Sequence, residues 1–243
     1  MGSRLMEETQ NRPKPLVEAG GKPLLWHIMQ NYARFGVTEF IVLVGYKGDL
    51  IREYFANFWM HQSDITFHLS SPLSQLEESG GSPWKVTVVE TGLLTQTGTR
   101  VSKIEQYVED NFLLTYGDGI SDVDIKKLID HHNINSALVT LTAVKPPARF
   151  GALEVEDSRV TKFKEKIDGD GSWINGGFFV VSKQIFDLIP KHDNSFELDV
   201  LPVVAELSGL YAHFHRGFWQ PVDTIRDLQK VEESIKAGLI PWI

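Results

Sequence analysis

The chain has 243 residues, a formal net charge of −8 and 42% hydrophobic residues, an ordinary share for a globular protein. The acidic balance argues against a nucleic-acid groove, because phosphate binding there depends on surplus Lys and Arg. Cysteine is absent, which excludes disulfides and thiolate metal sites, and no apolar run approaches the roughly 18 residues of a membrane span. We therefore expect a cytoplasmic protein.

Helices and strands alternate through the first half of the chain. The apolar periodicity and the Pro and Gly signals predict helices over 24–35, 49–58 and 122–132, and buried strands over 39–44, 85–90, 112–116 and 137–144. Asp122 is the expected cap of the third helix. This alternation predicts an α/β fold, with a mostly parallel sheet covered by helices on both faces.

The pattern changes after Pro146-Pro147. Short strands are expected over 152–155, 160–166, 173–181 and 211–215, and helices over 183–189, 197–207 and 224–237. We interpret residues 1–243 as one domain, with 1–145 as a nucleotide-binding half and 146–243 as a sugar-phosphate-binding half. Residues 59–84 lack a clear period, and we expect a functional, disordered or oligomer-contact segment there.

Two aspartates are candidate metal ligands. Asp118 follows a predicted strand directly, where open α/β sheets bind ligands, and a carboxylate there suits a hard cation. Gly117-Asp118-Gly119 alone favours an ordinary turn, and Asp223 alone could simply cap the next helix. Together, the two carboxylates could hold one magnesium ion that bridges nucleotide phosphates.

Two basic residues form the cationic half of this candidate site. A glycine beside Arg4 suits close approach to an anion, and prolines on both sides of Lys14 restrict that side chain. Each alone would be interpreted as a solvated surface group. Residues 97–100 resemble a loop and helix start whose N–H groups could hold an anion; an ordinary capped helix explains them equally well.

Polar groups with tight backbone recur in the second half. Arg149-Phe150-Gly151, Glu165-Lys166 and Asn175-Gly176-Gly177 could supply the acceptors, donors and cation that a sugar phosphate needs. A turn or strand edge explains each one individually. Their joint occurrence is what indicates a sugar-phosphate pocket.

Motifs along nearly the whole chain resemble the sugar-1-phosphate nucleotidyltransferases, and most closely the glucose-1-phosphate cytidylyltransferases. The resemblance rests on the segments 21–29, 45–48, 51–55, 116–119, 149–153, 174–179, 217–221 and 223–224. It implies a Rossmann-like fold of the nucleotide-diphospho-sugar transferase type. It also implies Mg²⁺-assisted in-line attack of glucose 1-phosphate on CTP, giving CDP-glucose and pyrophosphate. The attacking phosphate oxygen is already anionic, so no general base is required.

The resemblance also implies roles for individual residues. Asp118 and Asp223 resemble the magnesium ligands and, with Arg4 and Lys14, form the expected catalytic set. The expected nucleotide-binding residues are Gly2, Ser3, Arg4, Lys14, Thr97, Arg100 and Gly117. The expected sugar-phosphate-binding residues are Gly151, Glu165, Lys166, Asn175, Gly176 and Gln220.

The chain departs from the family pattern in two places. Ile167 stands where the family usually has proline, a mild change in loop stiffness. Family members also begin with an apolar strand and an Ala-Gly-Gly turn ahead of the Gly2-Ser3-Arg4-Leu5 segment, and here Met1 stands inside the motif. A start codon placed too late, a real truncation and an expression scar are the alternatives. A real truncation would expose neighbouring strand edges, and we then expect poor solubility or weak catalysis that the restored segment rescues.

Other functions stay open at this point. One is a nucleotidyltransferase that uses another nucleoside triphosphate or another hexose 1-phosphate; another is a non-catalytic paralogue that binds a nucleotide sugar. The resemblance implies a homo-oligomer, a hexamer in the family, with CTP and glucose 1-phosphate as its small-molecule partners. It also implies CDP-dideoxyhexose synthesis for the O antigen of bacterial lipopolysaccharide.

Overall fold

The computed structural model describes residues 12–58, 82–146, 152–156, 159–164 and 173–242. The helical elements are η1 (Lys14–Leu16), α2 (Leu24–Ala33), α3 (Gly48–Ala56), α4 (Thr97–Ser102), η3 (Glu105–Tyr107), α5 (Ile125–Ile134), η4 (Lys183–Asp187), η5 (Phe196–Val200), α6 (Leu201–Glu206) and α7 (Ile225–Lys236). The strands are β1 (Glu18–Ala19), β2 (Lys22–Pro23), β3 (Glu39–Val44), β4 (Lys85–Glu90), β5 (Phe112–Thr115), β6 (Gly119–Ser121), β7 (Val139–Val144), β8 (Ala152–Glu156), β9 (Arg159–Lys164), β10 (Ile174–Val181), β11 (Leu210–Phe214) and β12 (Trp219–Pro221).

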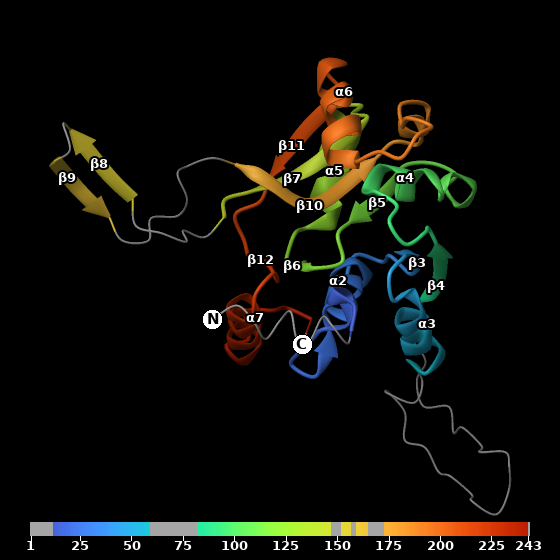
Figure 1. Cartoon of the computed structure of the whole chain (residues 1–243), viewed down its shortest axis with the longest axis horizontal. Coiled ribbons are helices and arrows are strands. Elements are labelled where there is room, and N and C mark those ends of the chain that lie inside the picture. Colours follow the sequence, from blue (N-terminus) through green and yellow to red (C-terminus); the bar gives the residue numbers. More distant parts are fainter. Residues whose placement is uncertain (1–11, 59–81, 147–151, 157–158, 165–172, 243) are drawn as a thin grey trace, which may run out of the picture.

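A four-stranded sheet, ordered β11-β7-β10-β5, forms the centre of the molecule (Figure 1). β11 runs parallel to β7, whereas β10 is antiparallel to both β7 and β5. β3 and β4 form a separate parallel pair. The predicted α/β class is confirmed, while the described strand pairings are mixed rather than mostly parallel.

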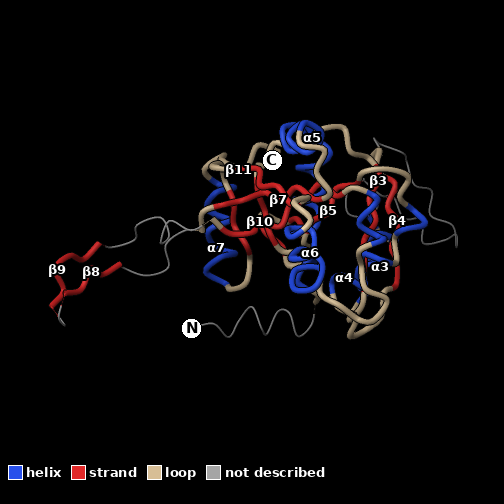
Figure 2. The backbone as a smooth tube through the Cα atoms, turned by 90° about the horizontal axis from the view of Figure 1, so that it is seen from above, coloured by secondary structure: helices blue, strands red, loops and turns tan. Residues whose placement is uncertain are grey.

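Both faces of the central sheet are covered by helices. Successive side chains of β10 point to opposite faces, and residues 176–181 are all buried, so each face must be covered. Phe178 and Val180 are buried on the face that α2 and α5 cover, in one core cluster with Ile28 and Leu128. The intervening β10 residues are buried against η5 and α6, in a second cluster that includes Phe179, Val181, Phe196, Val200 and Val204. Seen from above, helices lie on both sides of these strands (Figure 2).

The pair β3–β4 is less buried than its apolar sequence suggests. Residues 40–43 are only partly buried, although the sequence predicts a buried strand there. Among the described residues, no strand pairs with the second edge of β3 or with the outer edge of β5. Trp84, at the end of the predicted segment 59–84, packs edge-on against Phe40 with 5.6 Å between ring centroids; residues 59–81 lie outside the described range.

A short antiparallel ribbon, β6–β12, connects the central sheet to α7. Ile120 and Val222 are buried in one cluster with Leu24 and Val231, so the ribbon packs between α2 and α7. β8 and β9 pair with each other and stand apart from the other described elements in both views (Figures 1 and 2).

One helix cap differs from the sequence prediction, and a second decides an alternative that was left open for Asp223. Asp124, not Asp122, caps α5, and its side chain accepts a hydrogen bond from the Lys127 amide. Thr224, not Asp223, caps α7 in a reciprocal capping box with Asp227. Because Thr224 already satisfies the first amides of α7, the Asp223 carboxylate is available for other contacts.

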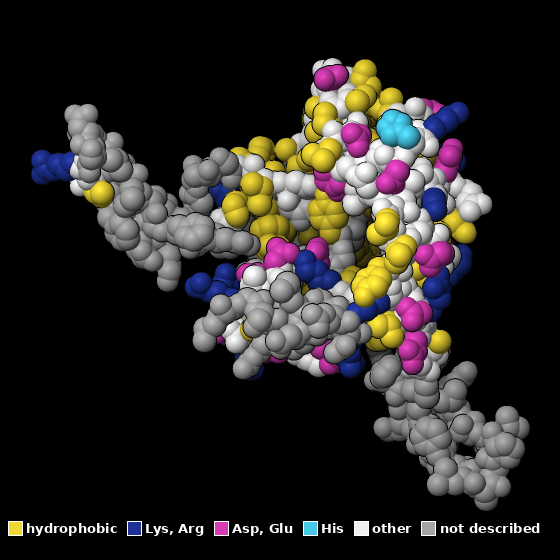
Figure 3. All heavy atoms as spheres, viewed as in Figure 1, with side chains coloured by type: hydrophobic (Ala, Val, Ile, Leu, Met, Phe, Trp, Pro, Cys, Tyr) yellow, Lys and Arg dark blue, Asp and Glu magenta, His cyan; other side chains and the backbone are white. Residues whose placement is uncertain are grey.

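The surface carries both signs of charge. Figure 3 shows acidic and basic side chains interspersed over the described surface of one face, with both signs meeting beside a central hollow. No helix among the described residues is long and apolar enough to cross a membrane.

Candidate active site

The β6–β12 ribbon brings the two candidate metal ligands together. Asp118 immediately precedes β6, and Asp223 lies two residues beyond the end of β12. The strands are antiparallel, with Gly119 opposite Pro221, and the Val222 amide donates to the Asp118 carbonyl at 2.9 Å. Two residues far apart in the sequence therefore share one end of the ribbon.

Lys14 lies between these carboxylates. Its Nζ donates to Asp118 Oδ2 at 2.9 Å and to Asp223 Oδ1 at 2.6 Å. Partial burial opposes the charge, but the hydrogen bonds to Asp223 and Asp118 outweigh it and raise the pKa of Lys14 above its ordinary value. A Cβ on Gly117 would come within 2.8 Å of the Pro15 ring, so the loop that carries Lys14 packs directly on the loop that carries Asp118.

The geometry is compatible with a hard cation. Two carboxylate oxygens that one ammonium can reach converge on a single point, and such oxygens are the ligands that Mg²⁺ prefers. The described residues contain no cluster of three or more His, Asp or Glu side chains able to hold a metal. Two protein ligands fit Mg²⁺, which usually keeps several waters or substrate phosphates in its coordination shell.

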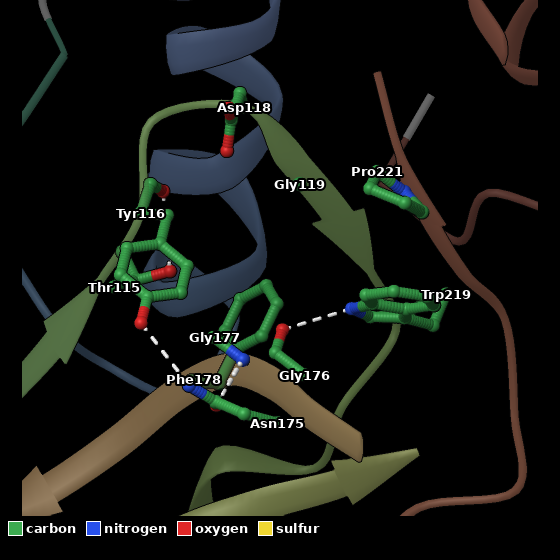
Figure 4. Close-up of a pocket in the computed structure, with 10 residues that line it drawn as sticks. All are labelled: Thr115, Tyr116, Asp118, Gly119, Asn175, Gly176, Gly177, Phe178, Trp219 and Pro221. Carbon is green, nitrogen blue, oxygen red and sulfur yellow. Dashed lines mark hydrogen bonds between the residues drawn. The ribbon is translucent and has the colours of Figure 1, made fainter. Parts of the chain in front are cut away.

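A small cavity adjoins Asp118 (Figure 4). Its volume of about 170 Å³ is below the roughly 300–1,000 Å³ typical of small-molecule pockets, so it suits one part of a larger substrate. A β-bulge in β10 forms its floor at Asn175-Gly176-Gly177, and bulges often lie beside active sites. The cavity is lined by Thr115, Tyr116, Asp118, Gly119, Asn175, Gly176, Gly177, Phe178, Trp219 and Pro221.

The comparisons with known proteins agree with this geometry. A model described as nucleotidyl transferase matches residues 1–238. The chain belongs to the nucleotidyl transferase family. It is 47% identical to the glucose-1-phosphate cytidylyltransferases of Salmonella typhi and Salmonella typhimurium, over 100% of this chain and 95% of each relative. Among solved structures, HddC from Yersinia pseudotuberculosis matches with a TM-score of 0.65 and 24% identity, over 92% of this chain and 90% of that one.

The family resemblance predicted from the motifs is thereby confirmed, and the solved structure independently confirms the fold. The roles of individual residues stay predictions. In this nucleotidyl transferase the structure brings together Lys14, Asp118 and Asp223, and it places Gly117, Asn175 and Gly176 beside them or in the adjoining cavity wall. The predicted residues Gly2, Ser3, Arg4, Gly151, Glu165 and Lys166 lie outside the described residues.

The start of α4 is held by contacts within the protein. The amides of Gly98 and Thr99 donate to the Asn194 carbonyl at 3.0 and 3.2 Å, so they are not available to a phosphate. The Arg100 guanidinium donates to the Thr95 carbonyl and to Thr91 Oγ1. Of the two alternatives for residues 97–100, these contacts agree better with the ordinary helix start, and the expected nucleotide contacts of Thr97 and Arg100 stay predictions.

Gln220 is also placed differently from its prediction. It is buried, and its Nε2 donates to the Pro221 carbonyl at 2.8 Å and to Asp227 Oδ1 at 3.2 Å. Side chains alternate along a strand, so Trp219 and Pro221 line the cavity while Gln220 faces α7. In this structure Gln220 Nε2 contacts Pro221 and Asp227 of α7, and its expected role at the sugar phosphate stays a prediction.

Sequence reasoning missed two aromatic walls of the cavity. Trp219 Nε1 donates to the Gly176 carbonyl at 2.8 Å, and the Tyr116 hydroxyl accepts from Asn175 Nδ2 at 3.1 Å (Figure 4). Their positions directly before Gly117-Asp118 and Gln220-Pro221 are a signal that could have indicated them. A tryptophan is more often a core or interface residue, and nothing in a single sequence separates a cavity wall from a core.

Gly177 gives a direct test of this cavity wall. Its φ is +80°, and a Cβ there would overlap the Tyr116 ring, so Gly177→Ala should lower the free energy of unfolding by about 2–4 kcal/mol. Gly21 is a matched control, because its φ is +75° and a Cβ on it would meet no atom within 4 Å. We expect Gly21→Ala to cost about 1–2 kcal/mol. Denaturant titration measures both, and equal losses would show that the Tyr116 contact contributes nothing.

Proposed function

We propose that this protein transfers a cytidylyl group from CTP to α-D-glucose 1-phosphate, releasing pyrophosphate and forming CDP-glucose. The observation that carries the proposal is the 47% identity to two glucose-1-phosphate cytidylyltransferases over the full chain. The convergence of Lys14, Asp118 and Asp223 at one end of the β6–β12 ribbon supports it.

In the proposed reaction, a phosphate oxygen of glucose 1-phosphate attacks the α-phosphorus of CTP. A new P–O bond forms, the bond to the bridging oxygen of the β-phosphate breaks, and pyrophosphate leaves. The nucleophile is already anionic, so the chain supplies positioning and charge neutralisation rather than a general base.

Asp118 and Asp223 would hold Mg²⁺, which supplies neutralisation of the charge on the triphosphate when it is bound. Lys14 would neutralise a further phosphate charge, because its ammonium already lies at the carboxylate pair and has three N–H donors. Residues 175–177 would form the hexose side of the site, since the cavity they line opens beside Asp118.

The cavity also bears on the proposed division of the single domain into two halves. Thr115, Tyr116, Asp118 and Gly119 belong to the proposed nucleotide half, and residues 175–178, Trp219 and Pro221 belong to the proposed sugar-phosphate half. A site at their junction suits a reaction that joins one substrate from each half. We further propose a cytoplasmic homo-hexamer that feeds O-antigen synthesis; the family resemblance is the support for these points.

The test is pyrophosphate release with glucose 1-phosphate and each of CTP, UTP, dTTP and ATP. We expect CTP to be preferred by at least about 100-fold in kcat/KM, since a site that hydrogen-bonds a base discriminates strongly against analogues. Faster turnover with another triphosphate would contradict the base assignment. Binding of CDP-glucose without turnover of any triphosphate would indicate a nucleotide-sugar-binding paralogue instead.

A further inference from the structure

Glu197 is a half-buried carboxylate that the proposed reaction does not use. It lies in η5, a single π-helical turn, and such turns occur frequently at functional sites. Three hydroxyl groups donate to it. Tyr116 Oη lies 2.7 Å from Oε1, while Thr97 Oγ1 and Ser195 Oγ lie 2.6 and 3.0 Å from Oε2.

The charge state of Glu197 decides which group donates in each of these three hydrogen bonds. Burial alone would raise the pKa of Glu197, but the hydrogen bonds from Thr97, Tyr116 and Ser195 lower it, so the group is ionised near neutral pH. An ionised carboxylate can only accept hydrogen bonds. The Tyr116 hydroxyl must therefore donate its single proton to Glu197, and its oxygen is left to accept.

The Tyr116 oxygen and the Gly177 amide together hold the side-chain amide of Asn175 in one orientation. The Tyr116 oxygen accepts from Asn175 Nδ2 at 3.1 Å, and Asn175 Oδ1 accepts from the Gly177 amide at 2.9 Å (Figure 4). If this amide were flipped, its oxygen would face the Tyr116 oxygen and its NH₂ group would face the Gly177 N–H, so both hydrogen bonds would be lost. These two contacts leave one N–H and one lone pair of the Asn175 amide for other partners, and Asn175 lines the cavity; such a pair matches the donor and acceptor of a hydroxyl group.

The same carboxylate also ties three segments together. The Thr97 hydroxyl accepts from the Phe196 amide at 2.9 Å while it donates to Glu197. Ser195 is the N-cap of η5, and its hydroxyl accepts from the Leu198 amide at 3.2 Å. Thr97 in α4 and Ser195 beside η5 thus hold Glu197 Oε2, while Glu197 Oε1 accepts from Tyr116.

We propose that Glu197 is a positioning residue, which acts through Tyr116 to hold the Asn175 amide in the orientation that recognises a hydroxyl of the sugar phosphate. The inference rests on the proposed function for the identity of that substrate. It assigns Glu197 no contact with either substrate.

The first test is Glu197→Gln, measured by steady-state kinetics at saturating nucleotide. The variant side chain has one acceptor oxygen in place of two, so the three hydroxyl donors can no longer all be satisfied, and the Gly177 amide is left as the main contact that orients Asn175. We expect KM for the sugar 1-phosphate to rise about tenfold, with kcat changed less than about threefold, because the lost contact serves ground and transition states alike. Glu206→Gln, the same change at an exposed position of α6, is the matched control and should leave both constants unchanged.

The second test asks whether Glu197 acts through Tyr116. Tyr116→Phe should raise the sugar KM to a similar extent, and adding Glu197→Gln to it should change that KM by less than about twofold. Independent, multiplying effects would overturn the inference. Tyr116→Phe leaves Glu197 its Thr97 and Ser195 partners, so an unchanged sugar KM in this single variant also overturns it, even if Glu197→Gln fails to fold.

The outcomes separate this inference from the proposed function. The kinetics use whichever triphosphate and hexose 1-phosphate the wild type turns over best. A wild type that turns over a pair, with Glu197→Gln unchanged in sugar KM, overturns the positioning role alone. A loss of thermal stability or of kcat without a change in sugar KM indicates a merely structural role and overturns it as well. A wild type that turns over no pair overturns both.

Discussion

Replacing Asp118 or Asp223 with asparagine is expected to lower kcat/KM for CDP-glucose formation by about 10²–10³-fold, the scale on which enzymes lose rate when a preorganised electrostatic group is removed. Both carboxylates converge on Lys14 Nζ, so each contributes to the same charge-binding point. Asparagine keeps the shape and one oxygen but removes the negative charge that would hold Mg²⁺. Pyrophosphate release over a range of Mg²⁺ concentrations measures the effect, and the apparent Mg²⁺ requirement should rise with the loss of rate.

Stability separates this loss from misfolding. Asp118 and Asp223 keep 37% and 54% of their side-chain surface exposed, so their ion pairs with Lys14 contribute little to folding and the variants should melt close to wild type. Asp130→Asn, on the exposed side of α5, is the matched control and should retain full activity. Activity near wild type in Asp118→Asn would exclude this residue as the ligand of an essential cation.

The elements predicted best from the sequence are those with a strong local pattern. The expected strands at 39–44 and 85–90 match β3 and β4 at both ends, and the helix expected over 24–35 is α2. Each is an apolar run or period bounded by Gly, Pro or a charge, so local propensity and tertiary packing agree there. β3 is less buried than the sequence predicts, because burial depends on which strands lie alongside, and a run of apolar residues does not specify that.

The ribbon that assembles the site could not be predicted in this way. β6 and β12 are three residues each, too short to show a period of two, and their pairing joins segments about 100 residues apart. From the sequence, Asp118 and Asp223 can be paired by their chemistry and by the family resemblance. Only the structure shows that both carboxylates contact Lys14 Nζ. The caps show the same limit. Asp122 and Asp124 both precede α5, and only the backbone conformation at Asp124 directs a side chain to the Lys127 amide.

The position of Lys14 between the two carboxylates predicts that replacing it weakens catalysis but strengthens cation binding. The Lys14 ammonium neutralises the two carboxylates, at 2.9 and 2.6 Å. A divalent cation that binds there must displace it, whereas in the proposed ternary complex the same ammonium is needed by the triphosphate. Lys14 Nζ therefore lies at the carboxylate pair where the proposed metal would bind.

Lys14→Met is accordingly expected to lower kcat/KM for CTP by about 100-fold while tightening Mg²⁺ binding to the nucleotide-free protein by up to about fivefold. The second effect corresponds to roughly 1 kcal/mol or less, the upper end for a partly exposed ion pair. Without the ammonium, Asp118 and Asp223 repel each other, and Mg²⁺ relieves that repulsion in the folded state only. Mg²⁺ should then raise the melting temperature of Lys14→Met more than that of wild type. Lys126→Met, at an exposed position of α5, controls for the lost charge and should behave as wild type. A smaller Mg²⁺-induced shift in Lys14→Met than in wild type would mean that the ammonium and the metal do not compete for these carboxylates.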